Sequence, residues 1–305
     1  MTMPVFPGWT IEHMHEEFVQ GMREDRVLFD SETEHQRLRL FENARFGRVL
    51  TLDGVVQTTE VDEFIYHEMI AHVPILAHGA VRRVLIIGGG DGGTAREVLR
   101  HPGIDHVTMV EIDAGVIEFS RTYLPSLSDG AFDDPRLEVE IADGVAFVAE
   151  TTQRFDLVLV DSTDPDGPGE GLFTRAFYEN ARACLAPGGI LITQNGVPFV
   201  MPEALSAPMS ILRDLFNGWG CYLAAVPSYS GGPMVFGWGA ENADAMIPAL
   251  GVLEDRFRAA GLATRYYSPA VHRAAFALPG YVQAMMPGDA QPTSGLRAPR
   301  SPSSG

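Results

Sequence analysis

Acidic side chains recur directly after apolar runs in the middle of the chain. The apolar runs 84–87, 107–110 and 157–160 are followed by Asp91, by Glu111 with Asp113, and by Asp161 with Asp164, and the alternating strand 137–142 is followed by Asp143. Because ligands of parallel sheets bind beyond the carboxyl ends of the strands, these carboxylates are candidates for one shared site. Asp113 and Asp143 could equally cap the helices that follow, which is a common role of Asp after a strand. A cluster of carboxylates suits a cationic ligand.

The glycine loop 88–93 narrows the ligand class. Its spacing Gly88-x-Gly90-x-x-Gly93 fits the dinucleotide fingerprint, and Glu111 lies about 20 residues further on, where a ribose hydroxyl needs an acceptor. Asp91 inside the loop works against a pyrophosphate, and no Lys-Ser or Lys-Thr follows the glycines as in a P-loop. The loop therefore predicts an adenosine-containing ligand with a cationic group.

No metal site is predicted. The segment 66–72 resembles the zinc helix motif, but His67 and His72 are five residues apart and would lie about 140° apart around a helix. Cys184 and Cys221 are too isolated to form a zinc site or a disulfide framework, so we expect two packed thiols in a reducing compartment.

Composition limits the class of protein. The chain has 305 residues, of which 46% are hydrophobic, enough for one large domain or two smaller ones. A net charge of −18 argues against nucleic acid and anionic membranes as partners, and favours either simple solubility or attraction of polycations. There is no long uncharged apolar run and no basic start followed by an apolar stretch, so the expected location is cytoplasmic.

Two patterns of elements follow from the spacing of apolar residues. Short alternating runs at 27–29, 35–41, 48–52 and 55–58 indicate a small antiparallel β domain, with Asp53-Gly54 as a hairpin turn, whereas residues 10–20 carry no strong signal. A helix is expected over 61–76. Strands and helices then alternate, with strands at 83–88, 106–112, 137–142, 156–161 and 189–195, a closing antiparallel hairpin of 221–226 and 234–238, and a helix over 243–260.

The predicted fold class is α/β. It comprises a doubly wound, mostly parallel, seven-stranded nucleoside-binding sheet of the methyltransferase-like kind, with a small N-terminal antiparallel β domain. We expect the β domain and its linking helix over 1–77, the Rossmann-like catalytic domain over 78–285, and a disordered tail rich in Pro, Ser, Gly and Arg over 286–305.

Taken together, the motifs resemble those of the polyamine aminopropyltransferases. The resemblance runs from Leu52 to about Tyr281, and its motifs are the glycine loop 88–93, Val110-Glu111-Ile112-Asp113, Asp133-Asp134-Pro135-Arg136, the loop Asp161 to Pro168, and Leu172-Phe173-Thr174-x-x-Phe177-Tyr178. It implies transfer of the aminopropyl group of decarboxylated S-adenosylmethionine to putrescine, giving spermidine and methylthioadenosine. It also implies no cofactor beyond that cosubstrate, and a homodimer or homotetramer.

The resemblance also implies roles for individual residues. It implies that Asp161 accepts the proton of the attacking amine, assisted by Tyr66. The polyamine contacts that it implies are His67, Asp91, Ser162, Asp164 and Tyr229, and the implied nucleoside contacts are Gln36, Gln57, Gly88, Gly90, Glu111, Asp143, Gly144 and Pro168. Asp91 would also repel the carboxylate of ordinary S-adenosylmethionine by roughly 4 kcal/mol at about 4 Å and a dielectric near 20.

Departures from the family pattern leave alternatives open. Asp166, Ser230 and the segment Gly93-Thr94-Ala95 differ from the residues usual in relatives, so cadaverine or a longer amine remains an alternative acceptor. A nicotinamide oxidoreductase would use the same glycine spacing, but it gives Asp91 and Asp161 no task. A non-catalytic nucleoside-binding protein needs only the sheet, and Tyr66, Asp161 and Asp164 argue against it.

Overall fold

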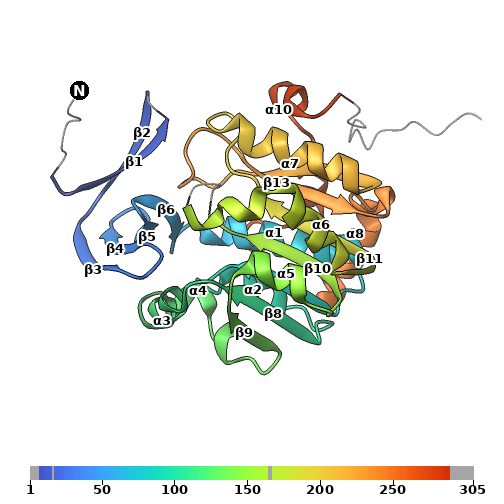
Figure 1. Cartoon of the computed structure of the whole chain (residues 1–305), viewed down its shortest axis with the longest axis horizontal. Coiled ribbons are helices and arrows are strands. Elements are labelled where there is room, and N and C mark those ends of the chain that lie inside the picture. Colours follow the sequence, from blue (N-terminus) through green and yellow to red (C-terminus); the bar gives the residue numbers. More distant parts are fainter. Residues whose placement is uncertain (1–6, 16, 164–166, 289–305) are drawn as a thin grey trace, which may run out of the picture.

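A seven-stranded sheet forms the centre of the molecule (Figure 1). The computed structural model describes residues 7–15, 17–163 and 167–288. The strand order is β12-β13-β11-β10-β7-β8-β9. The strands are β7 (Arg83–Gly88), β8 (His106–Glu111), β9 (Leu137–Ile141), β10 (Phe155–Asp161), β11 (Leu185–Gln194), β12 (Gly218–Ala224) and β13 (Met234–Ala240). β7 to β11 pair in parallel and β13 pairs antiparallel with both of its neighbours, which confirms the predicted α/β sheet and its closing hairpin.

Apolar residues of the strands alternate between two cores, one on each face of the sheet. In β7, for example, Val84 and Ile86 face one core, whereas Leu85 and Ile87 face the other. Because both faces are buried, the strands read as continuous apolar runs. The first core is covered by α1 (Glu63–His78), α2 (Gly93–Leu99), α8 (Leu250–Ala260) and α9 (Pro269–Ala275). The second is covered by α5 (Gly144–Glu150), α6 (Arg175–Ala183), α7 (Pro202–Leu215) and α10 (Gly280–Met285).

The N-terminal part forms two small antiparallel sheets beside this body (Figure 1). The four-stranded sheet contains β3 (Arg26–Glu32), β4 (Arg37–Asn43), β5 (Gly47–Leu52) and β6 (Val55–Thr59). Asp53 and Gly54 both have positive φ, at 51° and 87°, as a tight hairpin turn requires. This sheet packs against α3 (Ala114–Tyr123) and α4 (Pro125–Ser128), which fixes it over the carboxyl ends of the central strands.

The second small sheet is a hairpin that the sequence did not indicate. It contains β1 (Trp9–His15) and β2 (Phe18–Arg23), so residues 10–15 and 18–20 of the segment without a strong signal lie in strands. Most of its side chains are exposed or half-buried, so no apolar alternation marks it in the sequence.

The predicted helix over 243–260 is wrong in its first half. Residues Ala243–Ala245 form a short 3-10 turn, η3, and α8 begins only at Leu250. Pro248 explains the break, because proline disfavours a helical conformation at the preceding residue. Two further 3-10 segments are η1 (Ala131–Asp133) and η2 (Gly167–Phe173). Within the described ranges, none of the helices has the length and hydrophobicity needed to cross a bilayer.

A buried carboxylate ties α1 to a distant part of the chain. Glu68, which is 1% exposed, accepts hydrogen bonds from the backbone N–H groups of Arg265, Tyr266 and Tyr267 at 2.7–2.8 Å. Such charge-assisted bonds offset the cost of burying the charge. Tyr66 and His67 lie on the same helix, directly before Glu68.

Both cysteines are packed thiols, as predicted. Cys184 and Cys221 are buried and free, and they belong to the same core. Burial raises the pKa of both thiols, to about 12 for Cys221.

Candidate active site

Two adjacent cavities lie where the central strands end. The larger, of about 140 Å³, lies between the N-terminal sheets and the ends of β7 and β10. It brings together most of the predicted polyamine and catalytic residues: Tyr66, His67, Asp91, Asp161, Ser162 and Tyr229, together with Gln57 and Gly90. Residues about 160 positions apart in the sequence therefore form one site, as expected for the carboxyl edge of a parallel sheet.

The smaller cavity, of about 90 Å³, holds predicted nucleoside residues. It is lined by Gln36, Gly88, Glu111, Asp143, Gly144 and Ser162, among others. Ser162 and Thr163 line both cavities, so the segment directly after Asp161 separates the two spaces. Gln57, predicted as a nucleoside contact, lines only the larger cavity, as does Gly90. Asp164, Asp166 and the side chain of Pro168 lie outside the described residues.

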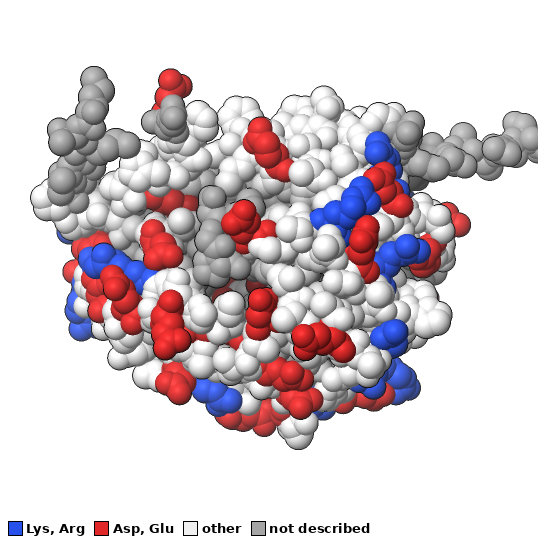
Figure 2. Space-filling model, viewed as in Figure 1, with Lys and Arg blue, Asp and Glu red and all other residues white. Residues whose placement is uncertain are grey.

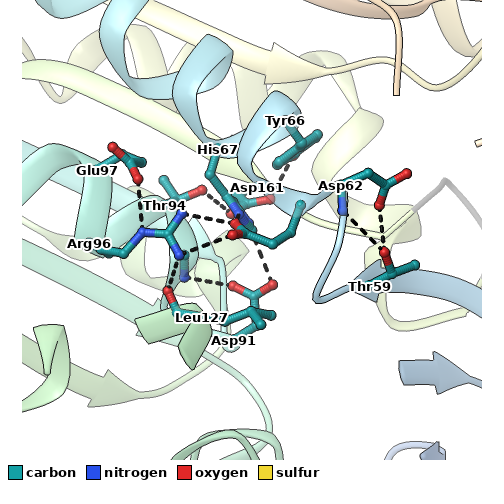
Figure 3. Close-up of polar contacts among 12 residues, drawn as sticks. Thr59, Asp62, Tyr66, His67, Asp91, Thr94, Arg96, Glu97, Leu127 and Asp161 are labelled. Carbon is teal, nitrogen blue, oxygen red and sulfur yellow. Dashed lines mark hydrogen bonds and ion pairs between the residues drawn. The ribbon is translucent and has the colours of Figure 1, made fainter. Parts of the chain in front are cut away.

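Asp161 is held by two hydroxyl groups. Tyr66 on α1 donates a hydrogen bond to Oδ1 at 2.6 Å, and Thr94 on α2 donates one to Oδ2, also at 2.6 Å (Figure 3). Burial, followed by the charge of Asp161, raises the pKa of Tyr66 well above its usual range, so Tyr66 remains a donor. Burial also raises the pKa of Asp161. A carboxylate with a raised pKa and a fixed orientation is suited to accept a proton.

The glycine loop makes this arrangement sterically possible. Gly89 N–H donates to the main-chain oxygen of Asp161 at 2.8 Å, and the φ angles of Gly88 and Gly89 are 83° and 72°. A Cβ on Gly88 would lie 2.2 Å from the Asp161 oxygen. Only glycine combines this left-handed conformation with so close an approach of two backbones.

His67 joins the cavity to a buried network of charges. Its Nδ1 lies 2.6 Å from Glu63 Oε2, and its Nε2 lies 3.4 Å from Asp91 Oδ2. Arg96 contacts the same Glu63 oxygen, Oε2, at 2.9 Å. It also pairs with Glu97 at 2.8 Å (Figure 3). Burial disfavours a charged His67 ring, but Asp91 and then Glu63 outweigh it and raise the pKa of His67 to about 10. The ring is therefore an imidazolium at neutral pH.

The same network compensates part of the negative charge of Asp91. Its Oδ1 accepts the N–H of Gly93 at 2.8 Å, and its Oδ2 faces the charged His67. Although burial opposes ionisation, His67 and the Gly93 N–H hold the pKa of Asp91 below its usual range. Asp91 is ionised, but His67 compensates part of its charge, so a repulsion of roughly 4 kcal/mol toward a substrate carboxylate is an upper value.

Glu111 has a very different environment in the smaller cavity. Burial raises the pKa of Glu111 to about 7. The backbone N–H of Asp113 donates a hydrogen bond to Glu111 Oε1 at 3.0 Å, which lowers the pKa but does not outweigh burial. Asp113 and Asp143 both cap helices by accepting the N–H groups of Gly115 and Val145. Asp143 also lines the cavity, whereas Asp113 accepts hydrogen bonds from Thr33 and Gln36 of the N-terminal region at 2.7 and 3.3 Å.

Several residues in or behind the cavities were not predicted from the sequence. The sequence marks Thr94 only as a departure from the family pattern. It assigns no role to Glu63, although the position of Glu63 four residues before His67 on a helix is a usable signal. Glu12 lines the larger cavity from β1 and is 7% exposed. No sequence signal identifies Glu12, because the hairpin that carries it has no recognisable pattern.

The surface near the site is acidic. On the face shown in Figure 2, Asp and Glu side chains are spread over the centre, whereas Lys and Arg lie mostly toward the edges. Such a field favours cations and raises their concentration near the site.

The fold and the two cavities define an enzyme of the nucleoside-dependent transferase class, in which the larger cavity is acidic. Comparison with known proteins identifies the family. The model described as "Spermine/spermidine synthase domain" matches residues 63–247, and the one described as "Spermidine synthase tetramerisation domain" matches residues 8–60. The chain therefore belongs to the spermine/spermidine synthase family.

Individual relatives agree with this assignment. The chain is 59% identical over 279 residues to the polyamine aminopropyltransferase of a Ruegeria species, covering 92% of this chain and 98% of the relative. It is 54% identical over 271 residues to polyamine aminopropyltransferase 1 of Pseudomonas aeruginosa, covering 89% and 95%.

Solved structures give the same result for the fold. A spermidine synthase in complex with the transition state analogue AdoDATO superposes with a TM-score of 0.87 at 36% identity, covering 93% of this chain and 96% of that one. The spermidine synthase of Thermotoga maritima gives a TM-score of 0.84 at 34% identity, covering 93% and 95%.

The charge state of His67 is directly measurable. We expect nitrogen NMR of the imidazole to show a doubly protonated His67 ring at pH 7.5, with His67→Gln used for assignment. His272 is the internal control, because burial lowers its pKa to about 4 and its ring should be neutral. Since the pKa of His67 is raised from about 6.5 to about 10, its contribution to stability is complete below pH 6.5 and is lost as the pH rises toward 10. A titration midpoint near 6.5 would contradict the paired arrangement.

Proposed function

We propose that the protein is a spermidine synthase, which transfers the aminopropyl group of decarboxylated S-adenosylmethionine to putrescine. One observation carries this proposal. Asp161 lies in an acidic cavity, held by Tyr66 and Thr94, next to a second cavity that contains Glu111. A cationic amine suits the first cavity and a ribose suits the second.

The proposed reaction is a direct displacement. The amine lone pair attacks the aminopropyl carbon bonded to the sulfonium, a C–N bond forms, and the C–S bond breaks with its electron pair passing to sulfur. The sulfonium becomes the neutral thioether methylthioadenosine, and the new secondary ammonium loses one proton to Asp161. Positioning and proton acceptance are therefore the two tasks of the protein.

The attacking amine must first be neutral. If its pKa resembles that of lysine, near 10.4, deprotonation at pH 7 costs about 4.6 kcal/mol. The nearby sulfonium favours the neutral amine, whereas a carboxylate favours the ammonium. The raised pKa of Asp161, caused mainly by burial, makes this carboxylate a better proton acceptor than an exposed Asp. Tyr66 fixes the direction in which Asp161 presents its free lone pairs.

The remaining residues support the same assignment of sites. His67, Asp91, Ser162 and Tyr229 are proposed amine-side contacts, and the hydroxyl of Tyr229 donates to the main-chain oxygen of Gln57 at 2.5 Å, which orients its ring along the cavity wall. Asp164 and Pro168 remain proposed contacts from the resemblance alone. Ser230 donates to the side chain of Gln20 on β2, so its hydroxyl joins the hairpin to the cavity wall.

Product analysis tests the reaction. With decarboxylated S-adenosylmethionine as donor and putrescine, cadaverine and spermidine as competing acceptors, we expect mass spectrometry to find spermidine and methylthioadenosine as main products. Asp161→Asn should lower kcat by at least about 100-fold, because it cannot accept the proton, while methylthioadenosine affinity stays within about twofold. Asp255→Asn on the exposed face of α8 is the matched control.

The possible outcomes separate the alternatives. A preference for cadaverine or a longer amine would change the acceptor but keep the reaction. Equal loss of turnover and nucleoside binding in Asp161→Asn would contradict its catalytic role. No product with any amine, despite nucleoside binding, would favour a non-catalytic nucleoside-binding protein.

Glu111 predicts a pH dependence of nucleoside binding. An ionised Glu111 can accept hydrogen bonds from both ribose hydroxyls, whereas a proton on its carboxyl competes with them. Because its pKa in the free protein is about 7, we expect methylthioadenosine affinity to fall by up to about tenfold per pH unit below 7. Calorimetry between pH 6 and 8 measures this. Glu111→Gln should bind weakly at every pH, and an unchanged slope in this variant would exclude Glu111 as the titrating group.

The proposal extends to assembly, location and domains. We infer a homotetramer or homodimer that associates through the N-terminal sheets, supported by the match of residues 8–60 to a tetramerisation domain and by the exposed apolar side chains Trp9, Phe18 and Val19. Sedimentation velocity should show an oligomer for the unmodified protein and a smaller species for Phe18→Asp. A monomeric unmodified protein would contradict the proposed assembly.

A cytoplasmic location agrees with the two free thiols. The domain boundary at 77 remains proposed, and the predicted tail lies beyond the described residues from position 289 onward.

A further inference from the structure

Thr94 contacts Asp161, but the reaction described above gives it no separate role. It lies in the first turn of α2, its side chain is completely buried, and its hydroxyl donates to Asp161 Oδ2 at 2.6 Å. Tyr66 donates to the other carboxylate oxygen from α1. The two donors approach from different helices, so the carboxylate cannot rotate without breaking at least one bond (Figure 3).

The surroundings of Thr94 leave the Asp161 carboxylate little other freedom. A Cβ atom on residue 89 would lie only 3.0 Å from Asp161 Oδ2. The backbone of the glycine loop therefore packs closely against this oxygen. Threonine is branched at Cβ and therefore stiff at χ1, which fixes the direction of its hydroxyl. Each carboxylate oxygen then has one lone pair bound by a hydroxyl and one left for a substrate proton.

We propose that Thr94 is a positioning residue for the reaction: its hydroxyl holds Asp161 Oδ2 so that Oδ1 and Oδ2 both direct their free lone pairs to the amine. This inference rests on the proposed function. It assigns to Thr94 a role distinct from that of Tyr66, because Tyr66 lines the cavity, whereas Thr94 lies behind the carboxylate and acts only through Asp161.

The same hydroxyl affects the protonation of Asp161. The groups that act on this carboxylate are His67, Asp91, Tyr66 and Thr94, and Glu111 lies within electrostatic range from β8. Burial raises the pKa of Asp161 and Asp91 adds to this, whereas His67 and the hydrogen bonds from Thr94 and Tyr66 lower it. Removing the Thr94 hydroxyl removes one hydrogen bond that lowers the pKa of Asp161. The protonated, inactive form of Asp161 should therefore persist to higher pH.

Isosteric substitution separates the hydroxyl from the shape of the side chain. Thr94→Val keeps the volume and the branch at Cβ but removes the donor, and Thr94→Ser keeps the donor. We expect Thr94→Val to lower kcat about tenfold and to move the acidic limb of kcat/KM to higher pH. KM for decarboxylated S-adenosylmethionine should not change. Thr94→Ser should restore kcat to within about threefold of the unmodified enzyme and return the limb to its original position.

The readouts distinguish the possible failures. Unmodified enzyme that forms no spermidine would contradict the proposed function itself. Active unmodified enzyme with the same kcat and pH profile in Thr94→Val would overturn only the inference about Thr94. If Thr94→Val does not fold, Thr94→Ala provides the comparison with Thr94→Ser. Equal losses of activity in the variant without the hydroxyl and in Thr94→Ser, with an unshifted acidic limb of the kcat/KM profile in each, would show a purely structural role of Thr94. That result would also overturn the inference.

Discussion

The site depends on one close contact between two pieces of backbone. The glycine loop after β7 lies against the last residue of β10, with Gly89 N–H bonded to the Asp161 oxygen and Gly88 in register with Asp161. This contact places the Asp161 carboxylate, the loop carboxylate Asp91 and the start of α2 close together. A larger residue at Gly88 would separate the two strand ends, and the hydroxyl of Thr94 would no longer reach Asp161.

The buried charges around this contact balance one another. Asp91, His67, Glu63 and Arg96 alternate in sign from the cavity wall into the interior, and each carboxylate has at least one cationic partner. Removing one partner of a buried pair leaves an uncompensated charge, which is far more costly than losing an exposed pair. Asp91 is therefore ionised, and its orientation is fixed by its contacts with His67 and the Gly93 N–H.

Much of the fold could be predicted from the sequence because the central strands are buried on both faces and carry continuous apolar runs. The carboxylates at their ends were predicted for the same reason, since topology alone brings Asp91, Glu111 and Asp161 to one edge. The hairpin β1–β2 was missed because it is largely exposed and has no apolar period. The partnerships of Thr94 and Arg96 could not be derived, because they depend on how α1 and α2 pack, which no local pattern encodes.

Glu68 links the assembly of the site to the order of protein synthesis. Its three backbone partners lie 197 to 199 residues later in the chain, beyond β13 and α8. While the chain is still emerging from the ribosome, α1 carries a carboxylate that has no partner for its buried position. The native contacts of Glu68 on α1 therefore cannot be completed until residues 265–267 have been made, after all of β7 to β13 have been synthesised.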